Sequence, residues 1–172
     1  TAVVAYGASS ASGIVVGKTI GAGDRAVLKR LVHTLEVLFS AIGLLTGLTI
    51  FLLRRPLLTV FGGTLTENAC RLSMQFMAVI AVTTVGTSYQ VACDNGIIRG
   101  GGDTAFSAKM NLISMWLIIV PLSALAAFRW ELAPVVVFFL LKWDQLYKII
   151  PVAIRLHSWK WVKVVTRNDN EV

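Results

Sequence analysis

The chain has 172 residues, of which 56% are hydrophobic and 15% charged, and its formal net charge is +7. Soluble domains carry about a quarter of charged residues, so this composition, with a mean hydropathy of +0.74, argues against a soluble globular protein. The basic residues lie at the ends of apolar blocks, as membrane flanks do, which argues against nucleic-acid binding. We therefore predict an all-α, polytopic membrane helix bundle with five transmembrane helices.

The first apolar block covers residues 2–22 and is dominated by small residues. Ser9, Gly13, Gly17 and Gly21 recur every four positions, which places them on one face of a helix. Without a hydrophobic effect in lipid, helices associate through such small-residue faces. We predict that this face serves helix packing. The chain begins inside this block, and we interpret it as the carboxy-terminal part of a longer protein.

The second block covers residues 31–53 and ends at Arg54, Arg55 and Pro56. His33 and Glu36 lie three residues apart in its first turns, which favours an interfacial pair over a proton relay. The turn before this block, around Asp24, is read as a glycine-terminated helix end followed by an aspartate cap.

A stripe of polar residues runs along the third block, which covers residues 72–94. Thr83, Thr87, Gln90 and Asp94 are spaced by four, three and four positions, so they share one helix face. We predict that this face lines a solvated substrate cavity. The alternative for Asp94, close to the helix end, is to cap the following loop or to pair with Arg99. The glycine-rich, basic sequence from Gly96 to Thr104 is expected to leave the helix.

The fourth and fifth blocks cover residues 110–128 and 134–156. Pro121 predicts a kink in the fourth, because the Leu117 carbonyl loses its donor. In the fifth, Asp144 and Lys148 share a face in the favourable acid-before-base order. Charges at mid-membrane are costly, so this pair is either a structural ion pair or part of a transport cavity.

The basic residues also predict an orientation. Residues 157–172 form a basic, tryptophan-containing tail. The positive-inside rule places the side with more Lys and Arg in the cytoplasm, and therefore the tail as well. That side carries Lys18, Arg25, Lys29, Arg30, Arg99, Lys109, Arg155, Lys160, Lys163 and Arg167, whereas the opposite side carries Arg54, Arg55, Arg71 and Arg129.

Several function classes are disfavoured. Residues 13–19 are one residue short of a phosphate loop, and residues 21–26 match a dinucleotide fingerprint without the strand that should precede it. No catalytic or metal-ligand constellation is present in the sequence, so we expect no enzyme, metal or cofactor. Cys70 and Cys93 lie at opposite ends of the third block, roughly 35 Å apart at 1.5 Å per residue, and cannot form a disulfide.

The sequence resembles the carboxy-terminal lobe of multidrug and toxic compound extrusion (MATE) transporters. The resemblance rests on GKTIGAGD (17–24), GIIRGGGDT (96–104), NLISMWLIIVPLSALAAF (111–128) and SWKWVKVVTR (158–167). It identifies a family loop motif composed of Gly96, Arg99, Gly100, Gly102, Asp103 and Thr104.

The resemblance implies that the five spans correspond to helices eight to twelve of a twelve-helix, two-lobed transporter. Residues 1–156 would then form part of the carboxy-terminal lobe, with the amino-terminal lobe of the same chain as its partner. Such proteins expel cationic amphiphilic compounds across the plasma membrane in exchange for Na⁺ or H⁺. The alternatives are a lipid-linked oligosaccharide flippase of the same superfamily and a non-transporting membrane assembly subunit.

Overall fold

The chain folds into five helical rods in a computed structural model, which describes residues 2–61 and 66–163. Thr1, the connection 62–65 and tail residues 164–172, including Arg167, lie outside the described residues. The first two rods are α1 (Ala2–Gly21) and α2 (Arg25–Phe61). The third rod consists of α3 (Glu67–Val91) and η2 (Ala92–Ile98). The fourth consists of α4 (Thr104–Ile113), η3 (Ser114–Ile119), α5 (Val120–Ala124) and η4 (Leu125–Arg129). The fifth consists of α6 (Pro134–Lys142), α7 (Asp144–Tyr147) and α8 (Ile149–His157).

The predicted all-α class is confirmed, and the rods have the surface of a membrane protein. Within residues 2–61 and 66–163, three helices are long and apolar enough to cross a bilayer: Arg25–Val60, Glu67–Ile98 and Thr104–Arg129. Large apolar side chains are exposed on every rod, as in Ile14, Leu44 and Phe128. In water such a surface would aggregate, whereas in lipid it needs no cover.

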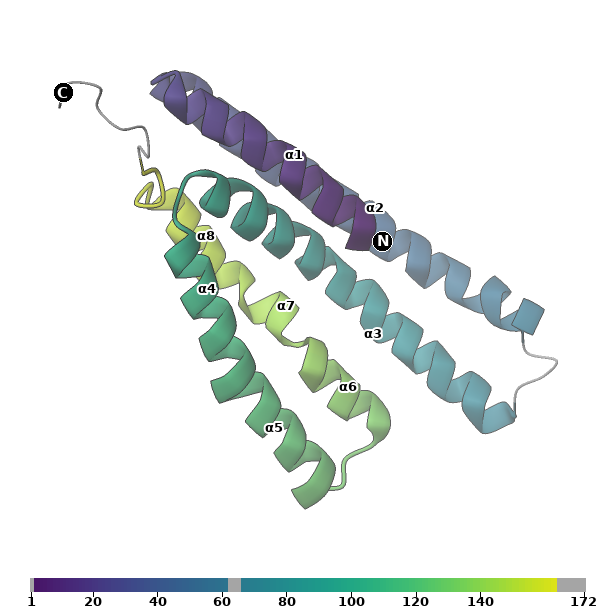
Figure 1. Ribbon diagram of the computed structural model, residues 1–172. Coiled ribbons are helices and arrows are strands. Elements are labelled where there is room, and N and C mark those ends of the chain that lie inside the picture. Colours follow the sequence, from purple (N-terminus) through teal and green to yellow (C-terminus); the bar gives the residue numbers. More distant parts are fainter. Residues whose placement is uncertain (1, 62–65, 164–172) are drawn as a thin grey trace.

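The α3–η2 rod contacts all the other rods and stands at the centre of the bundle (Figure 1). Glycines allow its closest approaches. A Cβ on Gly43 of α2 would lie 2.9 Å from Ser88 Cβ, and one on Gly47 would lie 2.7 Å from the Ala81 carbonyl oxygen. On the other side, a Cβ on Gly86 would lie 2.5 Å from the Gln145 carbonyl oxygen, so α7 packs directly on the α3 backbone.

Two rods contain π-helical turns, in which backbone hydrogen bonds reach back five residues. The Val120 N–H donates to the Met115 carbonyl, and this π segment lies directly before Pro121. Proline removes a donor and its ring crowds the carbonyl four residues earlier, which accounts for the π segment before it. In η2 the Arg99 N–H donates to the Asp94 carbonyl, again five residues back.

Two helices extend further than the sequence pattern indicates. Helix α2 continues through Pro56 to Phe61, and the Arg54 guanidinium lies 3.8 Å from the centre of the Phe51 ring. The glycine-rich sequence after Asp94 stays helical through Gly100, and only residues 101–103 leave the helix. The expectation of a longer loop was wrong, because the glycines serve close packing here and not chain reversal.

Candidate functional site

A chain of six hydrogen-bonded side chains joins η2, α4 and α7 inside the bundle; we call it the polar network. Its members are Asp94, Ser107, Asn111, Asp144, Gln145 and Lys148. Ser107 and Asn111 donate to the two carboxylate oxygens of Asp94, Asn111 over 3.1 Å. Lys148 Nζ donates to Asn111 Oδ1 and to Asp144 Oδ2, each over 3.0 Å. Gln145 Nε2 completes the chain with a 3.0 Å bond to the same Asp144 oxygen.

The charges in the polar network do not balance. Asp94 is fully buried, and the side chains of Lys148 and Asp144 are 6% and 17% exposed. By formal charge, two carboxylates face one ammonium group. Every other polar partner in the network is neutral. Uncompensated charge is expensive inside a membrane, and no other side chain in the network offsets this formal negative surplus.

The rod that carries Asp144 and Lys148 is broken twice, and the breaks set their positions. The α-helical pattern stops at Trp143, whose N–H donates to Leu140 only three residues back, and again at Lys148. Pro151 accounts for the second break, because it cannot donate to the Tyr147 carbonyl. Broken helices at this depth are tolerated where they are enclosed by protein or line a cavity.

The predicted polar stripe lies against neighbouring helices. Thr83 and Gln90 are 3% and 5% exposed, and Asp94 is fully buried. The Thr83 and Thr87 hydroxyls donate to their own backbone, to the Val79 and Thr83 carbonyls. Of the six predicted cavity residues, the structure therefore brings together Asp94, Asp144 and Lys148 in the polar network and leaves the other three outside it.

The small-residue face of α1 packs on η2. A Cβ on Gly13 would lie 3.1 Å from the Gly96 carbonyl oxygen, and one on Gly17 would lie 3.4 Å from that of Gly100. Ser9 is buried at the same contact. Gly21 has open space around it, so it is the one member of the predicted face that meets no neighbour. This packing fixes the segment that carries Asp94.

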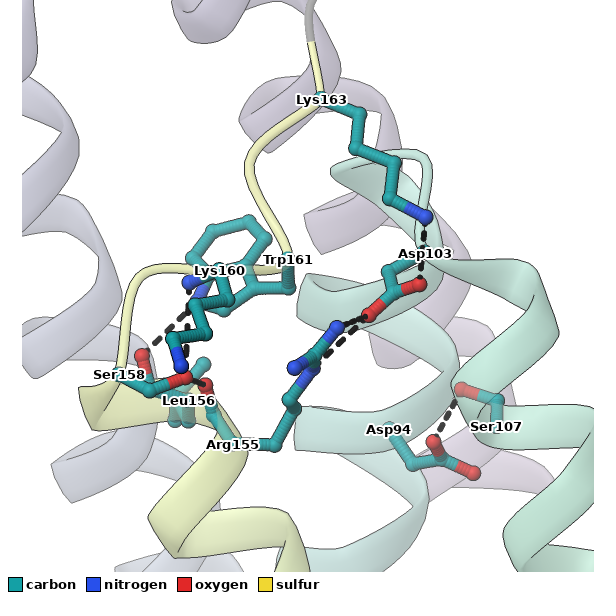
Figure 2. Close-up of polar contacts among 9 residues, drawn as sticks. All are labelled: Asp94, Asp103, Ser107, Arg155, Leu156, Ser158, Lys160, Trp161 and Lys163. Carbon is teal, nitrogen blue, oxygen red and sulfur yellow. Dashed lines mark hydrogen bonds and ion pairs between the residues drawn. The ribbon is translucent and has the colours of Figure 1, made fainter.

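The family loop motif is fastened to residues 158–163, which we call the strap (Figure 2). Asp103 accepts hydrogen bonds from Arg155 Nε over 2.9 Å and from Lys163 Nζ over 2.8 Å. The Lys163 N–H also donates to the Gly101 carbonyl over 2.9 Å. Buried Trp161 covers Gly101 so closely that a Cβ there would overlap with Trp161 Cε3. The motif is therefore a packing and ion-pair junction.

The remaining motif residues have different surroundings. Gly102 has φ +94°, which favours glycine, and Thr104 begins α4. Arg99 is exposed on the last helical turn and does not reach Asp94. Burial opposes the charge of Asp103, but the hydrogen bonds from Lys163 and Arg155 outweigh it and hold the pKa of this carboxyl below its ordinary value. Asp103 is thus a stable anion.

Glu36 takes partners other than the predicted one. The Tyr89 hydroxyl donates to Glu36 Oε1 over 2.8 Å, and His157 Nε2 lies 3.8 Å from Glu36 Oε2. His33 is exposed on the helix surface instead. The expected pairing of His33 with Glu36 within α2 was wrong. Glu36 instead accepts a hydrogen bond from Tyr89, which α3 places beside it.

Ser107 and Asn111 were not predicted from the sequence, although their spacing carries a signal. Ser107, Asn111 and Ser114 are spaced by four and three positions, the same helical stripe used to select Thr83 to Asp94. The missed stripe faces inward, since Ser107 and Ser114 are buried.

A cavity of about 420 Å³ lies at the opposite end of α3, and no predicted site residue lines it. Its lining is Arg54, Glu67, Cys70, Arg71, Met74, Gln75 and Ala78.

An all-α membrane bundle with charged side chains enclosed between broken helices is an architecture of membrane transporters. The MatE family model matches residues 1–125, and the chain belongs to this family, whose members are membrane transporters and not enzymes. It is similar to the uncharacterized transporter C4B3.13 of Schizosaccharomyces pombe (strain 972 / ATCC 24843), with 25% identity over 126 residues. That match covers 73% of this chain and 23% of the relative. No solved structure matches the chain.

Proposed function

We propose that the intact protein is a cation-coupled antiporter, which exports cationic amphiphilic drugs or toxic compounds across the plasma membrane in exchange for Na⁺ or H⁺. The observation that carries this proposal is the surplus negative charge of the polar network. Asp144 is its most accessible charged member, with 17% of its side chain exposed against 6% for Lys148. A proton or Na⁺ arriving at Asp144 would remove the surplus.

Charge neutralisation would change the packing of the network. Lys148 now bonds to both Asp144 and Asn111, and Asn111 bonds to Asp94. If Asp144 accepts a cation, its attraction for Lys148 weakens, and Lys148 and Asn111 are free to rearrange around Asp94. Because these residues come from different rods, a local ionic event would shift one helix against another. Such a two-state element is what alternating access requires.

The remaining walls of the transport pathway are proposed to come from an amino-terminal lobe of the same protein, since this chain spans 23% of its relative. The proposed orientation puts the carboxy terminus in the cytoplasm, supported by the basic residues clustered at that end of the rods. The flippase alternative is not favoured, because the match is to the MatE family. A non-transporting subunit would need no charge surplus between its helices.

The test is ethidium efflux from vesicles that contain the intact protein. We expect efflux when either an inward Na⁺ gradient or an inward H⁺ gradient is imposed, and none when both are collapsed. The gradient that drives efflux identifies the coupling ion. Equal efflux with and without both gradients, at matched protein levels, would exclude antiport.

A further inference from the structure

The end of the bundle that carries the strap exposes many cations. They come from four elements, namely the α1 end, the α2 start, the η2 end and the strap, and include Lys18, Arg25, Lys29, Arg30, Arg99 and Lys160. In the part of the chain that the structure describes, the carboxylates at this end are already engaged. Asp24 accepts hydrogen bonds from the Ala26 and Val27 N–H groups, and Asp103 is enclosed by Arg155 and Lys163. Among the described residues, the exposed cations at this end therefore outnumber the carboxylates.

The strap holds an aromatic side chain beside one of these cations and next in the chain to another. The Lys29 ammonium lies 5.8 Å from the centre of the Trp159 ring, and Lys160 is the next residue along the chain. The Trp159 ring lies 6.0 Å from that of buried Trp161, whose indole N–H donates to the Leu156 carbonyl over 2.8 Å. The Lys163 backbone is bonded to Gly101, so the strap segment that carries Trp159 and Lys160 is held at both Trp161 and Lys163.

The opposite end of the rods has a different charge pattern. Its arginines, such as Arg55, Arg71 and Arg129, are accompanied by exposed Glu67 and Glu131. A surface that exposes both arginines and glutamates has less preference for binding anions over cations. The contrast shows that the surplus of cations is larger at the strap end.

We propose that the strap end binds the headgroups of anionic phospholipids, with a lipid phosphate held between Lys29 and Lys160 beside the Trp159 indole. Tryptophan favours the headgroup level of a bilayer. Ammonium groups bind phosphate as point charges, and a basic residue near an anionic leaflet contributes to binding through the surface potential. The occupant is a lipid because the site lies at the end of lipid-exposed rods, where headgroups meet the protein.

The experiment compares the melting temperature of the intact protein in nanodiscs of phosphatidylcholine alone and with 30% phosphatidylglycerol. We expect phosphatidylglycerol to raise the melting temperature of the wild type, and 0.5 M NaCl to reduce the shift. The double variant Lys29→Gln/Lys160→Gln should lose at least half of the shift. Its melting temperature in phosphatidylcholine alone should match the wild type, which shows that the fold is intact.

Two further variants make the result specific. Lys29→Arg/Lys160→Arg keeps the charge and should keep the shift, and Arg55→Gln/Arg129→Gln removes the same charge from the other end and should also keep it. A full shift in Lys29→Gln/Lys160→Gln, or an equal loss in Arg55→Gln/Arg129→Gln, would overturn the proposal. So would a shift reproduced by inorganic phosphate in phosphatidylcholine nanodiscs, because the site would then bind the free ion.

Discussion

Asp103 and Asp144 are both carboxylates paired with a lysine, but their surroundings differ. Asp103 lies at the strap end between two cations whose side chains are 26% and 51% exposed. The surplus positive charge there reaches water, so the junction needs no further ion. Asp144 shares Lys148 with the network that contains buried Asp94, and the surplus there is negative and enclosed.

This difference indicates separate roles for two sites of similar composition. An ion pair whose excess charge is solvated has one stable state and holds the strap to the loop. Under the proposed function, the network with enclosed excess charge has two states, with and without a bound cation. The predictions below test whether location and charge balance, and not the mere presence of a buried acid, decide the role.

The largest effect is expected from Asp144→Asn in the intact protein. The substitution removes the surplus charge and should lower gradient-driven ethidium efflux at least tenfold, with expression unchanged. Asp103→Asn is the matched control at the strap end and should keep the ion dependence of efflux. Efflux is measured in vesicles with matched protein content. Normal coupling in Asp144→Asn would remove the polar network from the mechanism.

Next in size is Gly100→Ala, which tests the packing that positions Asp94. The added Cβ would lie 2.8 Å from Gly13 Cα, so two backbones must separate. Overpacking of this kind costs about 1–3 kcal/mol, and we expect a loss near the upper end. Unfolding in mixed micelles measures it. Gly21→Ala adds the same methyl group in open space and should be within about 0.5 kcal/mol of the wild type.

Asp103→Asn should lower the free energy of unfolding by about 1–2 kcal/mol, because charged hydrogen bonds are lost while both cations can turn to water. The pKa of Asp103 is lower in the folded state than in the unfolded one. Its stabilisation is therefore complete above the unfolded value of about 3.9 and is lost as pH falls through the folded value. The difference between wild type and Asp103→Asn should be constant from pH 5 to 8 and shrink below about pH 4; a difference that shrinks near neutral pH would contradict this account.

The smallest effect is expected from Lys142→Gln. Lys142 ends α6 and is exposed, whereas Lys148, six residues later, is buried. Removing an exposed cation should change stability by less than about 0.5 kcal/mol and leave efflux unaltered. Lys148→Gln should reduce both the stability and the efflux in the same assays. Equal effects of the two substitutions would show that enclosure does not matter for these lysines.

The sequence by itself determined the helical class, the small-residue face of α1 and the spacing that pairs Asp144 with Lys148. These features depend on periodicity within one helix, since residues three or four positions apart meet on one face. The family also followed from the sequence, because its motifs are contiguous segments. The Ser107–Asn111 stripe was readable in the same way.

Only the tertiary structure decided which distant residues meet. Asp103 and its partners Arg155 and Lys163 are separated by 52 and 60 positions, and Asp94 and Asn111 by 17. Their contact depends on how the rods are ordered and rotated, which no single helical pattern contains. The π-helical turns were also decided only by the structure. Backbone bonds that reach five residues back, not four, rotate the side chains that follow, and the hydropathy pattern of the sequence does not show this rotation.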